Sequence, residues 1–234
     1  MSKTANPERG IAFSPAELAA IRNGSKTQFR KVIVPQPMAV DDTSPQPYPV
    51  YIGFGKTVEW FGRKAPNNYR LLVSPFFVGQ RLWVKETWQA FEPKEIPFGG
   101  SSALRTAKMR VYDNHPVEGR SVIEYRADAP GDMGHWRSSI FMPRWAARTW
   151  LEVVEVRVQR LQEISEADAL AEGVAALFHS LTPDQAGLAG AWAREHNSTI
   201  KTGLYGYFWD SLNLKRGYGW EVNPWVRAVT FKVT

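Results

Sequence analysis

The sequence predicts an α+β fold, in which a mixed, mostly antiparallel sheet or small barrel carries short helices that join or cap its strands. Three observations predict this class. Two long segments, 147–161 and 225–233, are rich in β-branched and aromatic residues. Capping signals at Ser14, Ser165 and Thr182 mark the starts of helices. The strands do not alternate regularly with long helices, which argues against a doubly wound parallel sheet.

The first predicted helix covers residues 15–24. Pro15 fits the first helical position after Ser14, Glu17 completes a capping box, and Gly24 is placed to end the helix in the left-handed conformation. The apolar residues 32–34 predict a strand. Residues 35–75 contain seven prolines and predict an irregular insertion, with short strand pieces near 49–54 and 69–73.

Order resumes at residues 78–88, where apolar and polar side chains alternate as in a half-buried strand. We expect residues 89–120 to form a second loop-like insertion and residues 121–126 to form a strand. In the 147–161 strand the apolar series shifts between Val153 and Val154, which predicts a bulge or burial on both faces.

Three helices are expected in the second half of the chain. One follows Ser165, with Asp168 three residues on and Gly173 as its end. An added helix at about 183–196 follows the capping box of Thr182 and Gln185, and another covers about 203–214. Residues 225–233 form the last predicted strand, in which Arg227 interrupts the apolar face, so that this face lines a polar cavity or the register differs.

Composition excludes several classes of chemistry. The chain has 234 residues, no cysteine and a net charge of +6. It therefore has no disulfide, thiolate zinc site, iron–sulfur cluster or cysteine nucleophile. The four histidines lack metal-ligand spacing and no phosphate-binding glycine loop occurs, so we predict no metal and no cofactor. Without a signal core or a membrane-length apolar run, we expect a soluble cytoplasmic protein with no membrane partner.

Basic and aromatic residues gather in the same segments. Residues 135–150 hold three arginines and no acidic residue, and the chain has ten tryptophans. Such segments suit a polyanion whose bases can stack, so nucleic acid is the first partner to consider. The alternative is a basic surface over a tryptophan-rich core. Residues 24–31 add cations and hydrogen-bonding side chains, and a solvated basic turn is the alternative there.

Several blocks of the chain resemble one family when taken in order. They are Gly24-Ser25-Lys26-Thr27 followed by Arg30-Lys31, then residues 78–88, 124–128, 136–137, 142–146, 161–165, 171–173, 218–220 and 223–225. This series resembles the ASCH domain family, relatives of the PUA RNA-binding fold, and is similar to the long ASCH proteins encoded in bacteriophages and prophages. The resemblance covers residues 10–34, 78–88, 122–174 and 203–234.

The resemblance implies a single PUA-like domain over residues 1–234, with insertions at about 35–75 and 89–120. It implies a small β-barrel of five to six strands whose cleft is faced by the segment after the first helix. Family members are associated with RNA or nucleosides. Some look like amidohydrolases that remove an acyl group from N4 of cytidine, and at least one is a single-strand ribonuclease. The host would be a bacterial or phage-infected cell.

The family's lysine and glutamate match Lys26 and Glu172. Its threonine position holds Phe29 here, which removes the presumed nucleophile or its hydroxyl partner. A neutral Lys26 would serve as a base, and a charged one would bind phosphate or an oxyanion. The alternative is a structural ion pair between Lys26 and Glu172.

We therefore expect an RNA- or modified-nucleoside-binding protein with a basic, aromatic cleft. The expected contacts are Lys26, Thr27, Gln28, Arg30, Lys85, Trp136, Arg137, Arg144 and Trp145. One alternative is a hydrolase of N4-acylated cytidine or single-stranded RNA, with Lys26 and Glu172 as catalytic residues. A second is a phage-encoded interaction module that uses the two insertions. The oligomeric state is not predicted.

Overall fold

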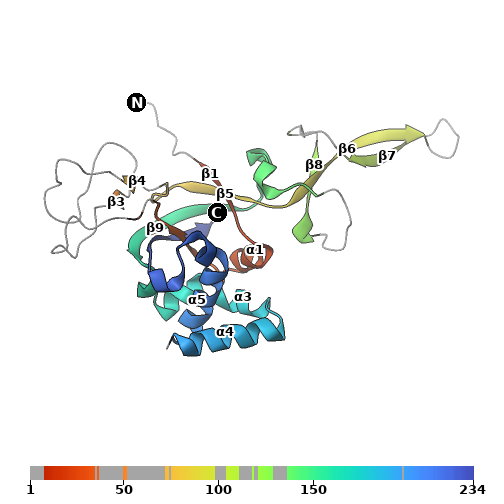
Figure 1. Ribbon diagram of the computed structural model, residues 1–234. Coiled ribbons are helices and arrows are strands. Elements are labelled where there is room, and N and C mark those ends of the chain that lie inside the picture. The colour runs from red at the N-terminus through yellow and green to blue at the C-terminus, as the bar shows by residue number, and fades with distance from the viewer. Residues whose placement is uncertain are drawn as a thin grey trace, which may run out of the picture. The chain divides into compact units, whose positions relative to one another are not determined.

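The computed structural model describes residues 8–34, 36, 50–51, 72–73, 75–97, 104–110, 118, 121–128, 136–196 and 198–234 (Figure 1). Helices and strands both occur, so the predicted α+β class is confirmed. The chain divides into two compact units. The first comprises residues 1–7, 16–81 and 151–234, and the second comprises residues 8–15 and 82–150. The predicted insertion at 35–75 lies mostly outside the described residues.

The sheet of the first unit is antiparallel. Strand β10 (Trp225–Val233) lies between β9 (Trp150–Arg160) and β2 (Gln28–Val32). The register of β9 against β10 shifts once, because Thr230 is opposite Glu155 whereas Phe231 is opposite Val153. This shift leaves Val154 without an opposite residue and confirms the predicted bulge. Two further short strands, β3 (Val50–Tyr51) and β4 (Leu72–Val73), pair in parallel.

The described residues include α-helices that belong mainly to the first unit: α1 (Pro15–Arg22), α2 (Glu166–Ala171), α3 (Val174–His179), α4 (Pro183–Glu195) and α5 (Ile200–Asn213). The capping signals act as predicted at α2 and α4. Ser165 Oγ accepts from the Asp168 N–H, and Thr182 forms a capping box with Gln185. Helix α3 was not predicted. It begins directly after Gly173, whose positive φ of 80° ends α2 and caps α3 at once.

The core of the first unit packs helices α2–α5 against the sheet. Its buried members are Leu161, Ile164, Ala169, Val174, Ala189, Leu204, Tyr205, Trp209, Trp220 and Val226. Strand β2 begins four residues earlier than the predicted segment 32–34, so the basic residues after α1 extend into it. Gln28 and Arg30 are two residues apart and therefore lie on one face of the sheet.

The second unit contains β1 (Arg9–Ala12) in parallel with β5 (Arg81–Lys85), and an antiparallel sheet of β7 (Leu104–Arg110), β6 (Trp88–Pro97) and β8 (Val122–Tyr125). The loop-like prediction for 89–120 is therefore wrong where β6 and β7 form a hairpin. Pro93 and Pro97 fit in β6 because that stretch pairs, among the described strands, with β7 only, so the other edge needs no N–H donor there.

The described strands form open sheets, and no pairing among them closes a barrel. The predicted barrel is not seen in this part of the chain. Trp88, Ala90, Met142 and Ala146 form the buried core of the second unit. None of the described helices has both the length and the apolar character needed to cross a membrane.

Candidate nucleic-acid interface

The segment after α1 meets the end of α2 through its backbone. Gly24, with φ of 79°, turns the chain, and the Lys26 N–H then donates to the Ala20 carbonyl at 3.0 Å. The Thr27 N–H donates to the Ala171 carbonyl at 2.8 Å. Lys26 and Glu172 are thereby bridge partners, although 146 residues separate them. Lys26 and Glu172 are therefore in contact, and a role of this contact in binding or catalysis stays a prediction.

The ammonium of Lys26 lies among oxygen atoms. Its Nζ donates to the backbone carbonyl of Glu172 at 2.7 Å and lies 3.4 Å from Glu172 Oε2. Glu17 Oε1 is also 3.4 Å away. Both residues of the central pair are buried, with Lys26 2% and Glu172 4% exposed. A buried ammonium with two carboxylates beside it has its charge compensated within the protein.

Arg30 extends this pair into a network. Its Nη1 donates to Glu172 Oε1 at 2.7 Å, and its Nη2 donates to Asp168 Oδ2 at 2.9 Å. Arg157 Nη2 donates to the other Asp168 oxygen at 2.7 Å, and Gln28 Nε2 donates to the same oxygen at 3.3 Å. We call Glu17, Lys26, Gln28, Arg30, Arg157, Asp168 and Glu172 the ion network. Its ion pairs and hydrogen bonds connect α1, β2 and β9 to α2.

The electrostatics of the ion network follow from its partners. Burial alone would raise the pKa of Asp168, but the hydrogen bond from Arg157 and the charges of Arg30 and Arg157 outweigh it, so this pKa is lowered. Burial, helped by the charge of Glu172, raises the pKa of Tyr205 well above its ordinary value. The guanidinium carbon of Arg30 lies 5.7 Å from the Tyr205 ring centroid. These contacts fit the structural ion-pair alternative.

The positions beside Lys26 take different environments. Thr27 is partly exposed, whereas Phe29 is buried and packs against Phe76 and Phe231 with ring centroids 5.2 and 6.0 Å apart. The position of the family threonine therefore belongs to an apolar cluster on the face of β2 opposite Gln28 and Arg30. A hydroxyl nucleophile has no counterpart at that position.

The second unit carries cations over aromatic rings. The described pairs, with distances from the charged group to the ring centroid, are Lys85 over Trp83 (5.0 Å), Arg126 over Trp136 (5.7 Å), Arg137 over Trp88 (4.9 Å), Arg144 over Trp150 (5.1 Å) and Arg148 over Tyr125 (3.7 Å). Proteins have about one such pair per 70–80 residues, so this unit is enriched in them. The predicted association of cations with aromatic rings is found, with partly different partners.

Residues 136–144, which we call the arginine strip, contain two of these aromatic-bound arginines, Arg137 and Arg144. Trp136 and Arg137 are partly exposed, and the side chain of Arg144 is 57% exposed and pairs with Glu8. Trp145 packs against the core of the second unit instead of lining the strip. The expected contact at Trp145 is therefore not supported by its packing, and the contact at Trp136, which is partly exposed, stays a prediction.

Sequence reasoning missed Phe141 and Arg126. Phe141 is 75% exposed and Ile140 is 66% exposed, and both lie in a short 3₁₀ turn, Ser139–Phe141. The turn is fixed from two sides, because Lys85 Nζ donates to the Ile140 carbonyl at 3.2 Å and Met142 is buried directly after it. An aromatic residue within a stretch free of acidic residues was the signal that could have found Phe141.

Comparison of the chain with family models, curated proteins and solved structures gives no match. The ASCH resemblance therefore rests on the motifs in the sequence.

Proposed function

We propose that this protein binds single-stranded RNA through the arginine strip. One observation carries the proposal: Phe141 is 75% exposed between Arg137 and Arg144, in a segment without any acidic residue. An exposed phenyl ring offers a platform for an unpaired base, and neighbouring arginines attract the phosphates. The ASCH resemblance supports the same class of ligand.

The strip suits single strands better than duplexes. Bases of a duplex are already stacked, whereas the bases of a single strand can stack on a protein side chain, which contributes about 1–3 kcal/mol per base. Arg126 is an exposed cation stacked on Trp136 and extends the positive surface. Arg137 precedes and Arg144 follows Phe141 in the sequence, and Arg144, whose side chain is 57% exposed, would exchange its pairing with Glu8 for a phosphate.

Fluorescence anisotropy with a labelled oligouridylate tests the proposal. Phe141→Ala is expected to weaken binding by roughly 5- to 150-fold, since it removes one stacking platform. Leu212→Ala is the matched control, because Leu212 is 73% exposed on α5 of the first unit and lies outside the strip. Equal affinity of the wild type and Phe141→Ala would contradict the assignment of the strip.

Salt dependence tests the role of the arginines. The logarithm of the affinity of single strands falls with the logarithm of salt concentration by about 0.7 per phosphate contacted. Arg137→Gln should reduce this slope by that amount, whereas Lys215→Gln, an exposed cation of the first unit, should leave it unchanged. Binding that does not depend on salt would exclude contacts with the phosphates.

A second candidate function is hydrolysis of N4-acylated cytidine or of single-stranded RNA, and the contact of Lys26 with Glu172 is the observation that favours it. The assay compares the wild type with Lys26→Ala and Glu172→Ala, with circular dichroism to check folding. Turnover that disappears in folded variants would support hydrolysis. No turnover in the wild type would leave binding as the function.

A further inference from the structure

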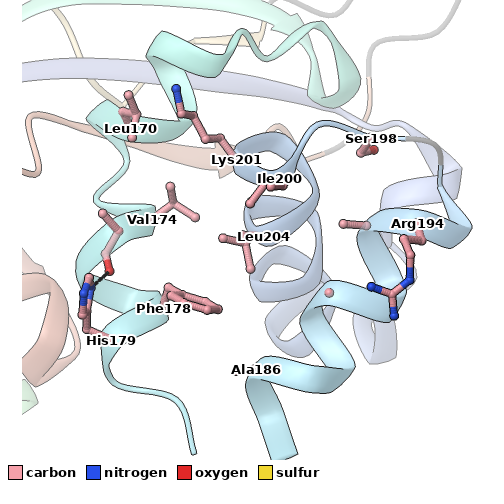
Figure 2. Close-up of a pocket in the computed structure, with 13 residues that line it drawn as sticks. Leu170, Val174, Phe178, His179, Ala186, Arg194, Ser198, Ile200, Lys201 and Leu204 are labelled. Atoms are coloured by element: carbon pink, nitrogen blue, oxygen red, sulfur yellow. Dashed lines mark hydrogen bonds between the residues drawn. The ribbon is translucent and has the colours of Figure 1, made fainter. Parts of the chain in front are cut away.

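Helices α2–α5 of the first unit line an open apolar pocket that plays no part in the proposed binding of RNA (Figure 2). Its volume of about 640 Å³ falls in the range of about 300–1,000 Å³ that is typical of pockets for small ligands. The apolar part of its lining consists chiefly of Leu170, Val174, Phe178, Ala186, Ala193 and Leu204.

The pocket owes its space to small residues on α4. Ala186, Gly190 and Ala193 follow each other at helical spacing and line it. A Cβ atom at Gly190 would have only the end of the Arg194 side chain within 4 Å, at 3.6 Å from Nη1. Gly203 and Gly206 of α5 differ, because Cβ atoms there would lie 2.4 Å from Ala193 Cβ and 2.1 Å from Trp192. Those two glycines allow close packing, whereas Gly190 leaves a volume unfilled.

The charged residues of the lining are all basic. Arg194 and Lys201 belong to it, together with His179, and no described lining residue is acidic. Lys201 Nζ lies 3.1 Å from Glu166 Oε2. Arg194 forms no ion pair with any residue in the described part of the chain, and its Nη1 lies beside Gly190. His179 turns Nδ1 toward the Ala175 carbonyl at 2.6 Å.

We propose that this pocket binds a small amphipathic carboxylate, such as a medium-chain fatty acid. The hydrocarbon part would lie among Val174, Phe178 and Leu204, where its burial replaces an empty apolar volume. The carboxylate would pair with Arg194, whose guanidinium can donate two hydrogen bonds to it. A neutral apolar ligand would leave this cation unused, and a phosphate-rich ligand would have no use for the apolar interior.

Isothermal titration of the full-length protein with decanoate, and with decanol as the neutral analogue, tests the inference. The wild type is expected to bind one decanoate, more tightly than decanol. Gly190→Leu should weaken decanoate binding more than tenfold because its side chain fills the pocket. Gly187→Leu is the matched control, since Gly187 lies in the same helix with nothing within 4 Å of a Cβ but does not line the pocket. Both substitutions raise helix propensity, so folding should be preserved.

Arg194→Gln tests the carboxylate. Because Arg194 is exposed, this substitution should weaken decanoate binding up to about fivefold, as expected for an exposed ion pair, and leave decanol binding unchanged. Decanoate binding that Gly190→Leu does not weaken would overturn the inference, as would the absence of saturable binding. A dimer that Gly190→Leu dissociates in analytical ultracentrifugation would also overturn it, because a second copy would then occupy the pocket.

Discussion

Replacing Glu172 with glutamine removes the one negative charge that Lys26 and Arg30 share. Both cationic side chains are almost fully buried, with exposed fractions of 2% and 0%, and Glu172 receives a contact from each. The amide of glutamine can accept from one cation but carries no charge to offset the other. Removing one partner of a buried ion pair costs about 3–5 kcal/mol, which is a large share of a total stability of about 5–15 kcal/mol. Lys26 keeps Glu17 at 3.4 Å and Arg30 keeps Asp168 at 2.9 Å, so we expect Glu172→Gln to lose about 3 kcal/mol, the lower end of this range.

Urea unfolding followed by tryptophan fluorescence measures this loss. With a slope of about 3 kcal/mol per molar urea, the midpoint should fall by about 1 M. Lys26→Met should cost less, because Glu172 then keeps Arg30 as a partner at 2.7 Å. Glu166→Gln is the control, because Glu166 pairs with Lys201 at the surface. The urea midpoint of this variant should stay near that of the wild type.

A local readout separates the ion network from the rest of the protein. The Thr27 N–H donates to the Ala171 carbonyl next to Glu172, so its hydrogen exchange reports whether the segment after α1 stays fastened to α2. Glu172→Gln should speed this exchange. An unchanged midpoint together with unchanged protection at Thr27 would refute the reasoning, because the two buried cations would then not depend on this carboxylate.

Two further predictions concern the same region. The pKa of Asp168 is lowered in the folded state, so its contribution to stability is present above the unfolded pKa of about 3.9 and is lost as the pH falls through the folded value. Asp168→Asn should flatten the fall in urea midpoint below about pH 5, and an unchanged acid slope would contradict this. Gly173→Ala should cost more stability than Gly24→Ala, although both have positive φ, because only at Gly173 would a Cβ lie 3.0 Å from Lys26 Cβ. The strain alone costs about 1–2 kcal/mol, and equal midpoints would argue against the added contact.

The predictable part of the fold is the part set by local chemistry. The caps at Ser165 and Thr182, the left-handed Gly24 and the bulge at Val154 each depend on a few neighbouring residues, and the structure has them all. The hairpin of β6 and β7 was not predicted. Pro93 and Pro97 fit in β6 only because, among the described strands, that stretch pairs with β7 on one edge and needs no N–H donor on the other. That information lies in the tertiary structure.

The candidate site also depends on contacts that local sequence patterns do not show. Asp168 occupies the capping-box position after Ser165, which would turn its side chain back to the cap residue. Instead its carboxylate binds Arg157, from the strand that precedes the helix, and Arg30, which is 138 residues away in the sequence. No local pattern shows this choice, and the pairing of Lys26 with Glu172 was accessible only through the family resemblance. Burial also determines which aromatic residues are available to a ligand, because Trp145 packs against the core of the second unit whereas Phe141 is 75% exposed.

Arg227 is the residue at which the sequence pattern and the fold conflict most directly. Strand β10, which contains Arg227, has the predicted bounds. Arg227 is only 6% exposed, and its Nε has no hydrogen-bond partner. No carboxylate of the described residues pairs with its guanidinium. Burial accordingly lowers its pKa. Because burying an uncompensated charge is costly, Arg227→Met should raise stability by about 1 kcal/mol or more, whereas Arg227→Lys, which keeps the charge, should not. A loss of stability in Arg227→Met would mean that the guanidinium makes a favourable interaction in solution, and the argument from its burial would then be wrong.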